Sequence, residues 1–266
     1  AYDASVQKVV ISQNTSSDGD SYLGTISGTT ITFGSQFQFT PNSCGRVKSI
    51  YDPDAQKVII FFQDNANEPA IRVATADNTG SISFSSKIEL DDRDMNTGAI
   101  AYDTNSNQTF AAWSNTQDSQ GEALMFRNAY TQRNLTSENY IGMSSGPVSP
   151  SVLGTELTYV SENASENILA FDSSNNKVVF AYTDGSNSPQ KGVAVVVNVS
   201  GTTMTAGSAV TFANVDTSMG GMAFDSSNNK IVIAYRDGSD TYGKAVVGTV
   251  SGTSISFGSP VTFKSG

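Results

Sequence analysis

The sequence predicts an all-β fold, a five-bladed β-propeller of four-stranded antiparallel repeats about 50 residues long. Three observations predict this class. An aromatic residue followed by Asp recurs five times along the 266 residues. Short runs of β-branched and aromatic residues follow each copy, as is typical of strands. No apolar pattern with the 3.6-residue period of a helix continues for three turns.

The aromatic-Asp pair marks the beginning of each repeat. The pairs are Tyr2-Asp3, Tyr51-Asp52, Tyr102-Asp103, Phe171-Asp172 and Phe224-Asp225, and consecutive Asp residues are 49, 51, 69 and 53 positions apart. We expect each Asp to form an Asx-type turn between the first strand of its repeat (strand A) and the second (strand B). We expect each aromatic ring to pack between blades, which explains its recurrence without a ligand.

Three further strands follow strand A in each repeat. Strand B begins at Lys8, Lys57, Gln108, Lys177 or Lys230, in runs such as "VVIS" and "VIIFF". Strand C, as in "YLGTIS" and "AVVGTV", ends at a tight turn before strand D. Gly tolerates positive φ, which two-residue hairpin turns require. The turn glycines are Gly28, Gly80, Gly201 and Gly252, whereas the third repeat lacks a clean glycine turn and carries surplus residues within 123–158.

The predicted blades form one domain and span residues 1–43, 44–94, 95–160, 161–214 and 215–266. Neither face of a four-stranded sheet can be covered by its own turns, so sheets stacked around an axis bury both faces. A string of small sandwiches or a solenoid is the alternative architecture. In the first repeat the anchor aromatic is already the second residue of the sequence, so strand A of this repeat is short. Either a longer chain was trimmed, or another subunit supplies the missing strand by β-augmentation.

Composition limits the possible functions. The net charge of −10 disfavours nucleic acid and anionic membranes as partners, and no apolar run is long enough for membrane insertion. The absence of histidine excludes Ser-His-Asp and Cys-His catalysis and His-ligated zinc. Cys44, the single cysteine, is interpreted as a small apolar filler. The abundance of Ser, Thr, Asn and Gly is typical of a β-rich extracellular or virion protein.

The loops divide into two sets at opposite ends of the blades. The A–B and C–D turns are short and uniform, whereas the B–C loops and D–A links vary, and function tends to lie on variable loops. A polar residue ends each strand B and could accept hydrogen bonds from sugar hydroxyls, or could instead cap the turn. The candidate ligand-binding residues are Asp64, Asn115, Asp184 and Asp237, with Thr15 at the same position, and the loop aromatics Tyr22 and Tyr242.

Two other kinds of site are weaker candidates. Asp92, Asp94 and Asn96 place oxygen ligands at alternate positions, as a calcium loop does, although no bidentate Glu follows at the twelfth position. No other cofactor is expected. Asn-x-Ser/Thr sequences are candidate glycosylation sites. They begin at Asn14, Asn107, Asn134, Asn163 and Asn198.

Catalysis is not expected from the sequence. The alternative is a glycoside hydrolase with a pair of carboxylates, and 25 acidic residues make such a pair available. None of these residues lies in an apolar context that would mark it, and S-x-D-x-G-x-T-W motifs are absent. Trp113, the only tryptophan, aligns with the aromatic residues of strand B in other repeats and is predicted to lie in the core. A role as a ring on which a sugar stacks is the secondary interpretation.

The clearest repeat unit, residues 224–263, contains "FDSSNNKIVIAYRDG" and "YGKAVVGTVSGTSISFGSPVTF". It resembles the repeats of β-propeller proteins of marine phage tail fibres and virions and of bacterial cell surfaces. The resemblance covers all five units, most clearly the fourth and fifth. It implies a propeller and an extracellular or virion setting, and it supplies no catalytic or ligand residues.

These inferences predict a non-enzymatic recognition or adhesion module, acting outside the cell or on a virion. It would bind a surface glycan or a surface protein through its B–C and D–A loops. The first alternative is a structural subunit of a filament or fibre, joined to other copies of itself at the short first blade. A glycan-cleaving enzyme is the least expected function.

Overall fold

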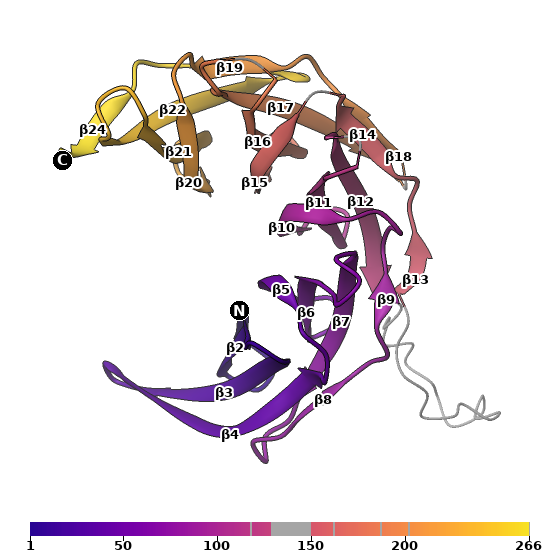
Figure 1. Ribbon diagram of the computed structural model, residues 1–266. Coiled ribbons are helices and arrows are strands. Elements are labelled where there is room, and N and C mark those ends of the chain that lie inside the picture. The colour runs from indigo at the N-terminus through magenta and orange to yellow at the C-terminus, as the bar shows by residue number, and fades with distance from the viewer. Residues whose placement is uncertain (118, 129–149, 162, 187, 202, 266) are drawn as a thin grey trace. The chain divides into compact units, whose positions relative to one another are not determined.

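The computed structural model describes residues 1–117, 119–128, 150–161, 163–186, 188–201 and 203–265 (Figure 1). These residues form strands and turns, and none of them belongs to a helix that would be long and apolar enough to cross a membrane. The chain divides into two compact units. The first comprises residues 1–92 and 126–153, and the second comprises residues 93–125 and 154–266.

The first two sheets lie in the first unit, and all their neighbouring strands are antiparallel. Sheet one has the order β1 (Tyr2–Asp3), β2 (Lys8–Asn14), β3 (Gly19–Ser27) and β4 (Thr30–Thr40). Sheet two has the order β5 (Gly45–Asp52), β6 (Lys57–Gln63), β7 (Pro69–Ala76) and β8 (Ile82–Phe84), with β9 (Ile88–Glu89) also paired to β7.

The other three sheets repeat this order. Sheet three contains β10 (Met95–Asp103), β11 (Gln108–Asn115), β12 (Gly121–Asn128), β13 (Pro150–Leu153) and β14 (Leu157–Val160). Sheet four contains β15 (Ala164–Asp172), β16 (Lys177–Asp184), β17 (Lys191–Ser200), β18 (Thr203–Ala206) and β19 (Val210–Ala213). Sheet five contains β20 (Thr217–Asp225), β21 (Lys230–Asp237), β22 (Gly243–Ser251), β23 (Ser254–Phe257) and β24 (Val261–Lys264).

The structure confirms the predicted fold class, an all-β protein of five four-stranded antiparallel β-propeller blades. Each predicted blade range contains one sheet. The fourth strand differs from the prediction, because four sheets divide it into two segments that both pair with strand C. At the division, an amide N–H still donates to strand C, as Gly207 does to the Val196 carbonyl at 2.8 Å. Most surplus residues of the third repeat fall in 129–149, outside the described residues.

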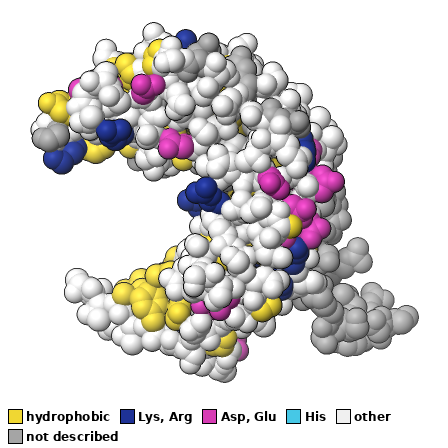
Figure 2. All heavy atoms as spheres, in the orientation of Figure 1, with side chains coloured by type: hydrophobic (Ala, Val, Ile, Leu, Met, Phe, Trp, Pro, Cys, Tyr) yellow, Lys and Arg dark blue, Asp and Glu magenta, His cyan; other side chains and the backbone are white. Residues whose placement is uncertain are grey.

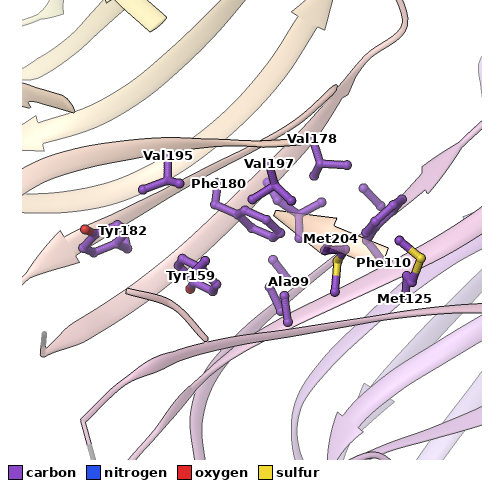
Figure 3. Close-up of a cluster of buried hydrophobic side chains, with 14 of the residues drawn as sticks. Ala99, Phe110, Met125, Tyr159, Val178, Phe180, Tyr182, Val195, Val197 and Met204 are labelled. Atoms are coloured by element: carbon purple, nitrogen blue, oxygen red, sulfur yellow. The ribbon is translucent and has the colours of Figure 1, made fainter. Parts of the chain in front are cut away.

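The central strands bury both of their faces. In β16, Val178, Phe180 and Tyr182 belong to a core shared with sheet three, and Figure 3 shows Phe180 and Tyr182 near Tyr159. Val179 and Ala181 alternate with them and belong to a core shared with sheet five. This two-sided burial explains why strand B reads as a continuous apolar run. A further core in the first unit joins sheets one and two.

The predicted A–B turns are confirmed in all five repeats. The anchor Asp accepts backbone hydrogen bonds from amides two or three residues later, as Asp172 does from Ser174 and Asn175 at 3.0 Å. Asp52, Asp103 and Asp225 accept the same two bonds, and Asp3 accepts one, from the amide of Ser5. The residue before each strand B has a positive φ of 53–54°, a feature that the sequence analysis missed. These residues are Gln7, Gln56, Asn107, Asn176 and Asn229.

Other predicted scaffold positions are also confirmed. The turn glycines Gly28, Gly201 and Gly252 have φ near 60°, and Gly80 has 96°. Trp113 is completely buried, and Cys44 lies in the core of the first unit. Burial, followed by the nearby carboxylates of two Asp residues, raises the pKa of the Cys44 thiol to about 11, which disfavours a nucleophilic role.

The first blade departs from the pattern. Its strand A, β1, is only two residues long, as predicted. The anchor aromatics of the other four blades are buried or pack against a core, whereas Tyr2 is 49% exposed. The packing role predicted for Tyr2 therefore stays a prediction.

Candidate functional site

The polar residues that end strand B cap the loops that follow them. The Oδ1 atom of Asp64 accepts hydrogen bonds from the amides of Ala66 at 2.8 Å and Glu68 at 3.0 Å. Asn115, Asp184 and Asp237 each accept one from the amide two residues later, and Thr15 accepts two through its hydroxyl. Turn capping, the alternative to ligand binding, thus accounts for these positions, and their role in binding stays a prediction.

The two loop aromatics lie in different settings. Tyr22 is half-buried and lies within β3, opposite Ile11 of β2, so it belongs to a strand and not to a loop. Tyr242 is half-buried in the B–C loop of the fifth blade. Its amide donates to Asp240, and its carbonyl accepts a hydrogen bond from the amide of Asp237. Each tyrosine therefore lies in its own blade, and their predicted stacking on sugars stays a prediction.

One predicted residue, Asp64, belongs to a group of three acidic side chains, which we call the carboxylate cluster. Asp64 follows β6, Glu68 precedes β7, and Glu89 ends β9, so the B–C loop and the D–A end of the second blade form it. One oxygen atom of each residue lies within 4.8 Å of the others. Asp64 is buried, Glu68 is half-buried and Glu89 is exposed, so the cluster is reachable from solvent.

Lys87 holds two members of the carboxylate cluster. Its Nζ atom donates to Asp64 and lies 2.7 Å from the carboxylate of Glu89. These hydrogen bonds raise the pKa of Lys87, which stays charged. Lys87 therefore offsets part of the repulsion between the two carboxylates that it contacts.

The surroundings of Glu68 in the carboxylate cluster raise the pKa of its carboxyl. Partial burial raises the pKa of the Glu68 carboxyl, and the charges of Asp64 and Glu89 raise it further, while Lys87 opposes them. A carboxyl with a raised pKa is a better proton donor near neutral pH than one at its ordinary pKa, and general acid–base catalysis uses such groups.

Charged groups at the same end of other blades are paired differently. In the third blade, the buried Glu122 accepts from Arg93 at 3.2 Å, and Arg93 also pairs with Glu156. In the fifth blade, Lys244 lies 2.6 Å from Asp237 and 2.7 Å from Asp240. A cation thus balances the acidic groups in both blades, as Lys87 does in the second. The carboxylate cluster is the one set of three close acidic groups found among the described residues.

The remaining candidates lie outside this cluster. It does not include Asp92 or Asp94, and the predicted calcium site at Asp92, Asp94 and Asn96 stays a prediction. Among the candidate glycosylation sites, Asn14, Asn107 and Asn163 are exposed and Asn198 is half-buried. Asn134 lies outside the described residues.

Glu68, Glu89 and Lys87 were not among the residues predicted from the sequence. Glu68 lies within a B–C loop, one of the loops predicted to carry function. Its position four residues after Asp64 was the signal in the sequence that could have identified it. Glu89 reaches the cluster because the second half of strand D pairs with β7, placing Glu89 opposite Ala70. The prediction treated strand D as one uninterrupted strand and gave no register for this segment.

No protein-family model and no curated protein matches the sequence. Among solved structures, the chain is similar to an exo-β-1,3-galactanase from Phanerochaete chrysosporium, at 8% identity and a TM-score of 0.49. This match covers 86% of the chain and 55% of the galactanase, so the chain spans about half of that protein. AofleA from Arthrobotrys oligospora matches at 10% identity and a TM-score of 0.49, with 99% of this chain and 73% of AofleA covered.

A subtype N11 neuraminidase-like protein of A/flat-faced bat/Peru/033/2010 (H18N11) matches at 11% identity and a TM-score of 0.40. The match covers 90% of this chain and 69% of that protein. Because these identities and TM-scores are low, no residue role is transferred from the three proteins. The predicted non-enzymatic adhesion function is nevertheless corrected, because the matches include a galactanase and a neuraminidase-like protein and give that function no support.

Proposed function

We propose that this chain hydrolyses glycosidic bonds at the carboxylate cluster, with Glu68 as the proton donor and Glu89 as the second carboxylate. The observation that carries the proposal is the close pair of carboxyl groups: one oxygen of Glu68 lies within 4.8 Å of one oxygen of Glu89. Partial burial and the neighbouring carboxylates also raise the pKa of Glu68. Glycoside hydrolysis requires two such carboxyl groups in different protonation states.

The spacing favours a retaining reaction, because retaining enzymes hold their two carboxyl groups about 5–5.5 Å apart and inverting enzymes hold them farther apart. Glu68 would protonate the glycosidic oxygen while the Glu89 carboxylate attacks the anomeric carbon and forms a glycosyl ester. Water would then cleave this ester and return a proton to Glu68. Asp64 and Lys87 would position the pair, since Lys87 contacts Glu89 and the Asp64 carboxylate accepts from the Glu68 amide.

The charge of the protein supports a class of substrate. The net charge of −10 and three clustered carboxylates repel polyanions. The substrate class that fits is therefore a neutral glycan. An extracellular or virion setting remains a separate proposal that rests on composition and resemblance.

The experiment is release of reducing ends from a panel of neutral oligosaccharides, followed by chromatography, with the product anomer read by NMR. Glu68→Gln and Glu89→Gln should each lower the rate by roughly 10²–10⁴-fold. Asp54→Asn, an exposed acidic residue in the A–B turn of the same blade, is the matched control. Hydrolysis of none of the glycans, or full activity in Glu68→Gln, would refute the proposal.

A further inference from the structure

Lys87 forms its ion pairs with two of the three residues in the carboxylate cluster. Its Nζ atom donates to Oδ2 of Asp64 and lies 2.7 Å from Oε1 of Glu89. Figure 2 shows acidic side chains beside basic ones over the region of β9, which Lys87 directly precedes. The positive charge is therefore held against the two neighbours of Glu68 and not against Glu68 itself.

The ion pair between Lys87 and Asp64 is partly shielded from solvent. The side chain of Lys87 is 30% exposed, and the side chain of Asp64 is 2% exposed. Salt screens a partly buried pair of charges much less than a pair at the surface. The amides of Ala66 and Glu68 also hold the Asp64 carboxylate in place. Lys87 is therefore fixed at a defined position beside the loop that carries Glu68.

Strand pairing identifies the equivalents of Lys87 in the other blades. Glu89 lies opposite Ala70, the second residue of β7, as Gln38 lies opposite Asp20, the second residue of β3. The same pairing with strand C relates Glu89 to Thr158, Thr211 and Thr262. Two positions before these residues, where the second blade has Lys87, the other blades have Gln36, Glu156, Ala209 and Pro260. A cation at this position is therefore specific to the blade that carries the carboxylate cluster.

The first blade shows what the cluster positions do without extra charges. Asp18 corresponds to Glu68, because the carbonyl of each accepts a hydrogen bond from the amide of the residue that ends strand B. The Asp18 carboxylate accepts hydrogen bonds from the hydroxyl of Thr15 and, at 3.0 Å, from the amide of Gln38. In the second blade both of these donors are replaced by carboxylates, those of Asp64 and Glu89. Glu68 therefore faces two negative charges, and Lys87 is the group that neutralises them.

We propose that Lys87 sets the pH range in which Glu68 serves as the proton donor, because its ammonium group neutralises the two carboxylates beside Glu68. This role rests on the proposed hydrolysis, and it makes Lys87 a positioning residue that acts through Asp64 and Glu89. The charged groups that face Glu68 are those two carboxylates, Lys87, and Asp92 in the link after β9. Burial raises the pKa of Glu68, the three carboxylates raise it further, and Lys87 lowers it.

The test removes the charge of Lys87 and follows the Glu68 carboxyl directly. Lys87→Gln gives the second blade the residue that the first blade has as Gln36. Carbon NMR of the glutamate carboxyl groups follows the titration of Glu68, whose signal is assigned by its loss in Glu68→Gln. Lys87→Gln should move the midpoint of this titration to higher pH. The alkaline limb of the pH–rate profile for glycan hydrolysis should move in the same direction, because the donor keeps its proton to higher pH. Lys87→Arg keeps the charge and should leave both close to those of the unsubstituted chain.

Lys48→Gln, at an exposed position of β5 in the same sheet, is the matched control, and circular dichroism verifies folding. A Glu68 midpoint that stays unchanged in folded Lys87→Gln, or that moves equally in Lys48→Gln, would overturn the proposal. A lower rate of hydrolysis with an unmoved pH profile would also overturn it, because Lys87 would then act only on the structure. The NMR titration needs no substrate. A shifted midpoint in a chain that hydrolyses none of the glycans would therefore refute the proposed function and still support the control of Glu68 by Lys87.

Discussion

At the residue scale, the A–B turns differ in whether the residue three positions after the anchor Asp can donate a hydrogen bond to the Oδ2 atom of that Asp. The Oδ2 atoms of Asp172 and Asp225 accept hydrogen bonds from the side chains of Asn175 and Asn228 at 2.9 and 2.7 Å. In the first repeat the corresponding residue is Val6, which has no donor. The Oδ2 atom of Asp3 is buried and has no hydrogen-bond partner among the described residues. A buried acceptor without a partner destabilises the fold.

Val6→Asn should therefore stabilise the first blade. The new amide would reach Oδ2 of Asp3 as Asn175 reaches Asp172, and the expected gain in the free energy of unfolding is about 1 kcal/mol. Urea denaturation followed by circular dichroism measures it. Ala4→Asn, at an exposed neighbouring position of the same turn, should leave the midpoint unchanged. A midpoint for Val6→Asn at or below that of the unsubstituted chain would contradict this interpretation.

Glu68→Gln should raise thermal stability at neutral pH. The folded-state pKa of Glu68 is raised above its unfolded value of about 4.3, so the folded chain loses stability as pH increases through that interval. Glutamine removes the repulsion from Asp64 and Glu89, and the gain should vanish below the unfolded pKa. Calorimetry at acid and neutral pH measures both limits, with Asp54→Asn as control. A variant less stable than the unsubstituted chain at neutral pH would show that Glu68 contributes favourably as a carboxylate.

At the element scale, strands were predictable from the sequence where a short run of apolar residues marks them. Strand boundaries that depend on the register with a neighbouring strand were not predictable. The run beginning at Lys177 predicts β16 because both of its faces are buried, which makes the segment continuously apolar. The division of strand D at Gly207 has no comparable signal. It falls between the pairs Val197–Ala206 and Ala194–Val210, where strand D has one residue more than the facing stretch of β17. The partners of Asp64 were missed for the same reason, since Glu89 lies on the second half of such a strand.

Gly207→Ala tests the role of that division in packing the fourth and fifth sheets. A Cβ atom at Gly207 would lie 1.9 Å from the carbonyl oxygen of Thr253, whereas one at the equivalent Gly258 would lie 3.9 Å from its nearest neighbour. We expect Gly207→Ala to lower the free energy of unfolding by roughly 1–3 kcal/mol, the usual cost of overpacking. Gly258→Ala should be nearly neutral in the same chemical denaturation. Equal effects of the two substitutions would mean that the close approach does not restrict this position.

At the scale of the whole molecule, the repeat predicts the class of the fold, and the charge balance governs its response to pH. The chain has no histidine, so no side chain titrates near neutrality at its ordinary pKa. Stability should instead depend on carboxylates whose pKa values folding has shifted. The largest paired group in the fifth blade is Lys244 with Asp237 and Asp240. The ladder that pairs Tyr235 with Lys244 brings Lys244 beside Asp237, and this register was not predictable from the sequence.

Lys244→Met should make the protein less stable at neutral pH but not in acid. Burial alone would raise the pKa of Asp237, yet hydrogen bonds from Lys244 and Ser239 lower it, and Lys244 also lowers the pKa of Asp240. Carboxylates with a lowered pKa contribute stability above their unfolded pKa of about 3.9, and this contribution is lost as pH falls through the folded value. The melting temperatures of variant and unsubstituted chain should therefore differ at neutral pH and converge in acid. Lys191→Met, at the end of the equivalent strand in the fourth blade, controls for loss of a lysine. A difference that persists unchanged at low pH would assign the effect of Lys244 to packing of its alkyl chain and not to its charge.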